Sequence, residues 1–280
     1  MPELPLAHYE FSAKDDKRLG QARQRLQRQC MRTLGFRDFP LDPGPWRGVR
    51  MASTFTSTLT YVSPYGLLDL DRARRWGYGI DPDQAKALEA ELRPKGRELT
   101  RREYEALYGP DTGAGAGGSS VVNGRKVPKD GCAGEARRRT AEGVADEGRL
   151  WSYVPERAAK IDKAVAEDER VRGAFGDWSR CVEDKGFKRY KNPARAFSDK
   201  AWQKGREGGN TSRTKEELGT AVADVECNRE LNTAGVWWAV TNEKQREDLR
   251  RNKSSYEAVR KDQGRVRAVV RETLGRSGTA

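Results

Sequence analysis

The sequence CMRTLGF occupies residues 30–36, and CVEDKGF occupies residues 181–187. Both follow the pattern C-x4-G-F, and apolar residues at three- and four-residue spacing precede each copy. These residues are Leu19, Ala22 and Leu26 in the first copy, and Val171, Phe175 and Trp178 in the second. The spacing predicts an amphipathic helix whose last turn carries the cysteine. The glycine then supplies the left-handed residue that commonly ends a helix, and the phenylalanine can fold back onto the last turn.

The repeat predicts two related helical halves, residues 1–150 and 151–280. Each half holds one further cysteine on a second predicted helix, Cys132 in the first and Cys227 in the second. Facing helices can bring two Cα atoms to the roughly 4.4–6.8 Å that a disulfide needs. Of the three pairings that four cysteines allow, the repeat favours Cys30–Cys132 and Cys181–Cys227, each within its own half.

Two alternatives for the cysteines remain open. The first is that they are free buried thiols. The second is a metal site, but the chain has no C-x2-C or C-x-C pair and its only histidine is His8, which argues against zinc. If the bridges form, they imply an oxidising compartment.

The composition favours helix pairs over a large sheet. Of 280 residues, 35% are hydrophobic and 34% are charged, so the core of such a chain should be thin. Val, Ile and Thr rarely alternate with polar residues, and the strand candidates are Thr54–Val62 and Ser120–Asn123. We therefore predict a mainly all-α protein.

Between the two cysteine repeats the pattern changes several times. Residues 37–80 are rich in proline and read as an irregular insert. Helices are expected at Asp81–Arg93 and at Thr100–Tyr108, the second opening with a T-x-x-E capping box. Residues 109–131 read as a flexible glycine-rich loop; they lack the Gly-Lys-Ser/Thr pattern of a phosphate-binding loop.

The second part of the chain is predicted to consist of helices, with a loop that contains Gly205, Gly208 and Gly209 before the last of them. Helices are expected near Glu135–Glu142, over Pro155–Asp184 and from Thr214 onwards. The tail, Thr241–Leu274, is predicted to be one long polar helix or a helix pair, with Gly264 as the residue that could interrupt it.

The chain carries 54 Lys plus Arg against 42 Asp plus Glu, a formal net charge of +12. Nucleic acid, anionic lipid or an acidic envelope polymer would suit this balance. The charges are interleaved, however, as in Glu167–Arg170 (EDER), which is typical of solvated helix faces.

The first residues, MPELPLAHYEF, have neither the charged region nor the apolar region of a secretory signal. No run of about 18 apolar residues predicts a membrane span. Because the cysteines favour an oxidising compartment, we expect an extracellular or cell-envelope protein in a mature or mis-started form. The alternative is a cytoplasmic protein.

Five segments carry a resemblance to a family: CMRTLGF at 30–36, RARRWGYGI at 72–80, GCAGEA at 131–136, DWSRCVEDKGF at 177–187 and ADVECNRELNTAGVWWAV at 223–240. They resemble uncharacterised exported proteins and lipoproteins of actinobacteria, notably Streptomyces. The resemblance runs from about Leu6 to the tail helix. It implies export and disulfide bonds, and it supplies no activity.

Catalytic signals are weak. His8 lies in an N-terminal segment that we expect to fray, which argues against Ser-His-Asp and Cys-His sites. A lysozyme-like, carbohydrate-active hydrolase would need two carboxylates. Acids near apolar residues are Asp177, Glu183, Asp224 and Glu226, and nothing in the sequence selects a pair. We predict no catalytic, cofactor-binding or metal-binding residue.

Aromatic residues beside cations give a better indication of function, because such surfaces bind glycans, peptides or bases. We expect Trp178 to fill the core. The predicted ligand surface consists of Arg75, Trp76, Tyr78, Tyr190, Trp237 and Trp238. The sequence thus predicts a non-catalytic, extracytoplasmic binding protein without cofactors, whose partner is an anionic envelope component or another protein. The alternatives are a lysozyme-like hydrolase and a nucleic-acid-binding protein.

Overall fold

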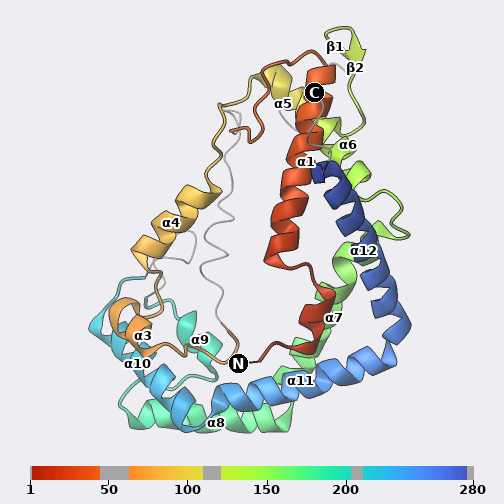
Figure 1. Cartoon of the computed structure of the whole chain (residues 1–280). Helices are drawn as coiled ribbons and strands as arrows, with labels where there is room; N and C mark the ends of the chain where they lie inside the picture. Colours follow the sequence, from red (N-terminus) through yellow and green to blue (C-terminus); the bar gives the residue numbers. More distant parts are fainter. Residues whose placement is uncertain (1, 45–62, 110–120, 203–210, 276–280) are drawn as a thin grey trace. The chain divides into compact units, whose positions relative to one another are not determined.

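A computed structural model describes residues 2–44, 63–109, 121–202 and 211–275 (Figure 1). Within these ranges the protein is mainly helical, and its one sheet is a hairpin of β1 (Val121–Val122) and β2 (Arg125–Lys126). The predicted all-α class is confirmed. The strand expected at Ser120–Asn123 is reduced to β1, and the one expected at Thr54–Val62 lies outside the described residues.

The chain forms two compact units, each assembled from three stretches. Unit 1 comprises Met1–Ala7, Ala52–Arg93 and Glu156–Arg251, and unit 2 comprises His8–Met51, Pro94–Pro155 and Asn252–Ala280. These units do not coincide with the halves 1–150 and 151–280. The segment that includes Tyr78 packs with the second half of the chain, whereas the C-terminal helix packs with the first.

Unit 2 is built around the long helix α1 (Ala13–Thr33). It packs against α6 (Gly131–Thr140) and α12 (Lys253–Gly275), and α5 (Arg101–Tyr108) packs against both α1 and α6. The core between α1, α5 and α6 includes buried Met31, Phe39, Leu107 and Cys132. The first residues of α7 (Glu147–Ala166) also belong to this unit.

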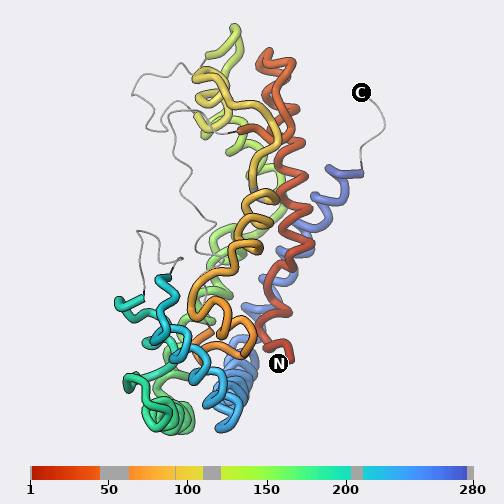
Figure 2. The backbone as a smooth tube through the Cα atoms, turned by 90° about the vertical axis from the view of Figure 1, so that its left-hand side faces the viewer, coloured from red at the N-terminus to blue at the C-terminus, as the bar shows by residue number. Residues whose placement is uncertain are grey.

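Unit 1 is built around α10 (Lys215–Glu230), which lies beside α3 in both views (Figures 1 and 2). Helix α10 packs against four others: α3 (Leu70–Trp76), α8 (Glu169–Asp184), α9 (Pro193–Phe197) and α11 (Thr233–Arg251). The largest buried side chains of its core are Trp178 and Trp202, as expected for Trp178. Helix α4 (Pro82–Leu92) follows α3.

Side-chain caps set the starts of several helices, including the capping box predicted at Thr100. The hydroxyl of Ser12 accepts from the Asp15 N–H at 3.1 Å, and the Asp15 carboxylate accepts from the Ser12 N–H at 3.2 Å. Thr100 and Glu103 form the same reciprocal box at the start of α5. Helix α3 lies inside the stretch expected to be irregular, and there Asp69 supplies the cap.

Both cysteine helices end in the same motif. In α1 the Phe36 N–H donates to the Met31 carbonyl, and Gly35 has φ of 94°. In α8 the Phe187 N–H donates to the Val182 carbonyl, and Gly186 has φ of 87°. These bonds are those of a Schellman motif with glycine in the left-handed position, so the predicted helix ends are confirmed.

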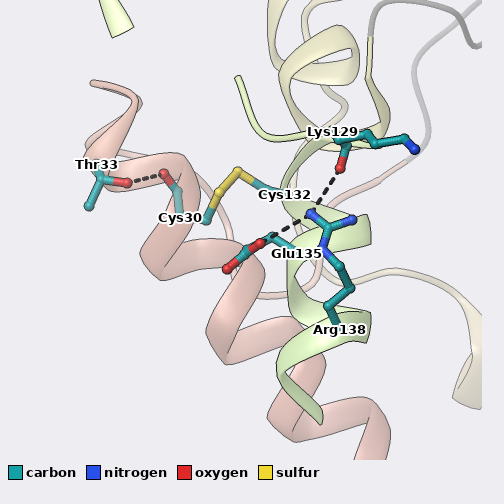
Figure 3. The surroundings of a disulfide bond; sticks show 6 residues. All are labelled: Cys30, Thr33, Lys129, Cys132, Glu135 and Arg138. Atoms are coloured by element: carbon teal, nitrogen blue, oxygen red, sulfur yellow. Dashed lines mark hydrogen bonds and ion pairs between the residues drawn. A yellow bond between two sulfur atoms is a disulfide. The ribbon is translucent and has the colours of Figure 1, made fainter. Parts of the chain in front are cut away.

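Each of those helices carries one disulfide. Cys30 on α1 is bonded to Cys132 on α6, with Cα atoms 5.6 Å apart (Figure 3), and Cys181 on α8 is bonded to Cys227 on α10, with Cα atoms 5.8 Å apart. Beside the first bond, Arg138 donates to Glu135 at 3.1 Å and to the Lys129 carbonyl at 3.0 Å. The predicted pairing is therefore present, one bridge in each unit.

The tail is a helix pair, and its break lies at Asn252, between α11 and α12. Gly264 lies within α12 and does not interrupt it. Of the expected loop 109–131, residues 110–120 lie outside the described part of the chain. None of the helices described has the length and apolar character needed to cross a bilayer.

Candidate functional site

The residues of the predicted ligand surface all belong to unit 1, in different surroundings. Arg75 is exposed in the last turn of α3. Trp76 is half-buried, and the guanidinium of Arg213 lies 4.7 Å from its ring centroid. Tyr78 is only 2% exposed, so it is a core residue and not part of the surface.

The two adjacent tryptophans of α11 are also engaged within the protein. Trp237 is half-buried, with its ring centroid 5.1 Å from that of Tyr65. The indole N–H of Trp238 donates to the Pro2 carbonyl at 2.9 Å. Tyr190 lines a groove, but it is only 6% exposed and its side chain belongs to the core of unit 1, so it is not the surface residue that the sequence predicted.

In the core, Tyr78 contacts Asp224, a carboxylate on α10 with no exposed surface. Oδ1 of Asp224 accepts from the Trp178 indole N–H at 2.9 Å. Oδ2 accepts from the Leu67 N–H at 3.3 Å and the Tyr78 hydroxyl at 3.4 Å. Burial raises the pKa of Asp224 to about 7, although the three hydrogen bonds act to lower it.

Glu217 lies seven residues before Asp224, on the same face of α10, and is also fully buried. It accepts from the backbone N–H of Tyr78 at 3.2 Å and of Arg213 at 2.7 Å. The two acids thus hold three backbone segments against α10: the one before α3, the one after α3 and the one before α10 itself. Both are wholly buried and accept hydrogen bonds from the protein's own donors, so we interpret both as structural.

The other acids singled out in the sequence form surface ion pairs. Asp177 pairs with Arg180, and Glu183 lies 3.4 Å from Arg189. Glu226 lies 3.1 Å from Lys185. Exposed pairs of this kind contribute at most about 1 kcal/mol and leave their carboxylates in solvent.

A groove of about 710 Å³ lies in unit 1, along α8 and the segment after it. Arg172, Phe175, Gly176 and Ser179 line it from α8, at the spacing of one helix face. Residues 189–192 (RYKN) line it as well. Helical spacing around Gly176 could have indicated the first four, but nothing local predicts that residues 189–192 join them.

Hydrogen bonds fix residues 189–192 against the core. The hydroxyl of Ser179 donates to the Tyr190 carbonyl at 2.6 Å. The Tyr190 hydroxyl donates to Asp199 at 3.0 Å, and the Lys188 ammonium reaches the same carboxylate at 2.7 Å. The Asn192 side chain caps α9. The groove is therefore preformed.

The lining carries three cations and one carboxylate, namely Arg172, Arg189, Lys191 and Glu167. Arg189 has Glu183 as a solvent-exposed partner. Arg172 and Lys191 lie within ion-pair distance of no described carboxylate. Phe175 is half-buried and adds aromatic surface to the same lining. Such a site suits an anionic ligand that also has apolar surface.

Within the described part of the chain, no cluster of His, Cys, Asp or Glu side chains could hold a metal ion. Comparison with family models, with curated proteins and with solved structures gave no match. Inference about the groove therefore rests on its own side chains.

Proposed function

We propose that the protein is a non-catalytic, extracytoplasmic binding protein whose groove along α8 holds an anionic component of the cell envelope. The observation that carries this proposal is the cationic groove along α8, whose lining includes the half-buried ring of Phe175. The lining has more positive than negative side chains: three cations, Arg172, Arg189 and Lys191, and one acid, Glu167. Guanidinium groups bind phosphate and carboxylate groups through paired hydrogen bonds.

The two disulfides support the extracytoplasmic part of the proposal. Bonds of this kind persist in oxidising compartments and are rare in the cytosol. Four alkylatable thiols in protein taken from its native compartment would contradict this location.

The carboxylates favour binding over hydrolysis. A glycosidase of the lysozyme type places two acids on either side of the scissile bond. Among the described lining residues of the groove, Glu167 is the one acid. The buried acids Asp224 and Glu217 accept hydrogen bonds from the protein itself, which accounts for them without a substrate.

Gly176 offers a direct test. It lies in α8 and lines the groove, and a Cβ placed there meets no atom within 4 Å. Gly176→Leu would therefore fill the groove without disturbing the core. Gly173→Leu is the matched control, because Gly173 is equally open, lies on the same helix and does not line the groove.

The measurement is isothermal titration calorimetry with a short oligo(glycerol phosphate), and a neutral dextran oligomer of similar size as the second probe. We expect the phosphate oligomer to bind and the dextran not to bind. Gly176→Leu should weaken binding at least about tenfold, and Gly173→Leu should not change it. If three phosphates are neutralised, the logarithm of the affinity should fall with the logarithm of salt concentration at a slope of roughly −2 to −3.

Three outcomes would count against the proposal. Equal binding of both probes would show that charge does not select the ligand. Unchanged affinity in Gly176→Leu would place the ligand elsewhere. Much tighter binding of a DNA oligonucleotide with the same number of phosphates would favour the nucleic-acid alternative.

A further inference from the structure

Unit 2 has a groove of its own, of about 360 Å³, between the start of α1 and the second half of α12. These two helices pack against each other within the unit (Figure 1). The volume is within the range of about 300–1,000 Å³ typical of small-molecule sites.

The bottom of this groove is apolar and firmly packed. Leu19, Val266 and Val270 line it and are buried in one hydrophobic cluster. Phe11 lines it too, and its ring stacks on Trp151 with centroids 5.2 Å apart. Leu19, Val266 and Val270 are already out of water, so the half-buried Phe11 ring is the apolar surface that an alkyl chain would cover.

The cations of the groove differ in whether they have partners. Arg267 donates to the Asp15 carboxylate at 3.1 Å, and its guanidinium lies 5.3 Å from the Phe11 ring centroid. Lys14, Arg18 and Arg271 also line the groove, and no described carboxylate lies within ion-pair distance of any of these three. One acid therefore faces four cations, and three positive charges remain for a ligand.

We propose that this groove binds an alkyl phosphate, with the phosphate among Lys14, Arg18 and Arg271 and the alkyl chain against the half-buried ring of Phe11. A phosphate monoester carries up to two negative charges and several acceptor oxygens, so it matches several cations better than a single carboxylate does. The site is separate from the groove of unit 1 and does not depend on the function proposed for it.

Gly264 gives the blocking variant. It lines the groove from α12, and a Cβ there meets no atom within 4 Å. Gly264→Leu would fill the groove and also remove a glycine from a helix interior, which favours folding. Gly20→Leu is the control, because Gly20 is equally open on α1 and does not line the groove.

The experiment is calorimetric titration of the full chain with decyl phosphate below its micelle concentration. Decyl maltoside supplies the same chain without charge, and inorganic phosphate supplies the charge without the chain. We expect saturable binding of decyl phosphate, at least about tenfold tighter than that of either comparison probe. Gly264→Leu should weaken it at least about tenfold, Lys14→Gln with Arg18→Gln should weaken it similarly, and Gly20→Leu should leave it unchanged.

Equal affinity for decyl maltoside would overturn the proposal, because it would show apolar capture alone. Retained affinity in Gly264→Leu would overturn it as well, since the ligand would then lie elsewhere. Vesicles containing phosphatidic acid distinguish the source of the phosphate: binding to vesicles but not to monomeric decyl phosphate would point to a membrane surface and contradict a site for a single alkyl phosphate.

Discussion

A buried carboxylate such as Asp224 makes the stability of the fold depend on pH. Burial raises its pKa from an ordinary value near 3.8 to about 7, so the folded protein binds this proton more tightly than the unfolded chain does. The stability that the group contributes is therefore complete below about pH 4. It is lost as the pH rises towards 7, by at most about 1.4 kcal/mol per pH unit.

Asp224→Asn should remove that dependence. The amide keeps one acceptor oxygen for the Trp178 indole but places its NH₂ among donors, which should cost about 1–3 kcal/mol at low pH. The cost should shrink or reverse near pH 7, where the wild-type residue is a buried charge. Urea unfolding at several pH values between 4 and 8 gives the difference between variant and wild type. Using this difference cancels the contribution of Glu10 and Asp162, whose pKa values burial also raises.

Asp177→Asn is the control for this experiment, because that carboxylate is exposed and pairs with Arg180 at the surface. It should follow the wild-type pH profile. A constant difference between Asp224→Asn and wild type across the range would show that Asp224 is not the group that titrates.

At the level of a helix and its end, the Schellman motif of α8 predicts that replacing a glycine by alanine changes the stability in opposite directions at two positions. Gly186 has φ of 87° and open space around its Cβ, so Gly186→Ala adds backbone strain without a steric clash. We expect it to destabilise the protein by about 1–2 kcal/mol. Gly173, inside the same helix, should behave in the opposite way, and Gly173→Ala should stabilise by up to about 1 kcal/mol. Urea unfolding of the two variants checks the contrast; the same sign for both would mean that the left-handed residue does not limit the end of α8.

The helix ends were predictable because the signals are local. A serine or threonine three residues before an acid, or a glycine before a phenylalanine, acts within one turn of chain. The surroundings of Asp224 were not predictable, because its donors Leu67, Tyr78 and Trp178 come from distant parts of the sequence. The groove along α8 has the same origin: helical spacing marks Arg172 and Phe175, but only the fold adds Tyr190.

Over the whole chain, the sequence repeat and the compact units do not describe the same division. The repeat follows chain order, whereas each unit combines three separate stretches. The disulfides agree with both descriptions, since Cys30–Cys132 lies within unit 2 and Cys181–Cys227 within unit 1. Composition and local pattern predicted the bridges. They did not predict which distant segments share a core, because that depends on long-range packing and has no local sequence pattern.

This arrangement predicts that each bridge stabilises its own unit. The bonded cysteines are separated by 102 residues in unit 2 and by 46 in unit 1. Restricting the unfolded chain over such loops is worth about 5 and 4 kcal/mol, respectively, in the loop-entropy model.

Replacing Cys181 and Cys227 by alanine should therefore speed amide hydrogen exchange in α8 and α10 and leave α1 and α6 close to wild type. Replacing Cys30 and Cys132 should do the reverse, so each double variant is the control for the other. Hydrogen–deuterium exchange read by mass spectrometry on peptides from these four helices makes the comparison. Equal acceleration in all four helices by either double variant would mean that the two units unfold as one cooperative body, and the bridges would then stabilise the whole chain.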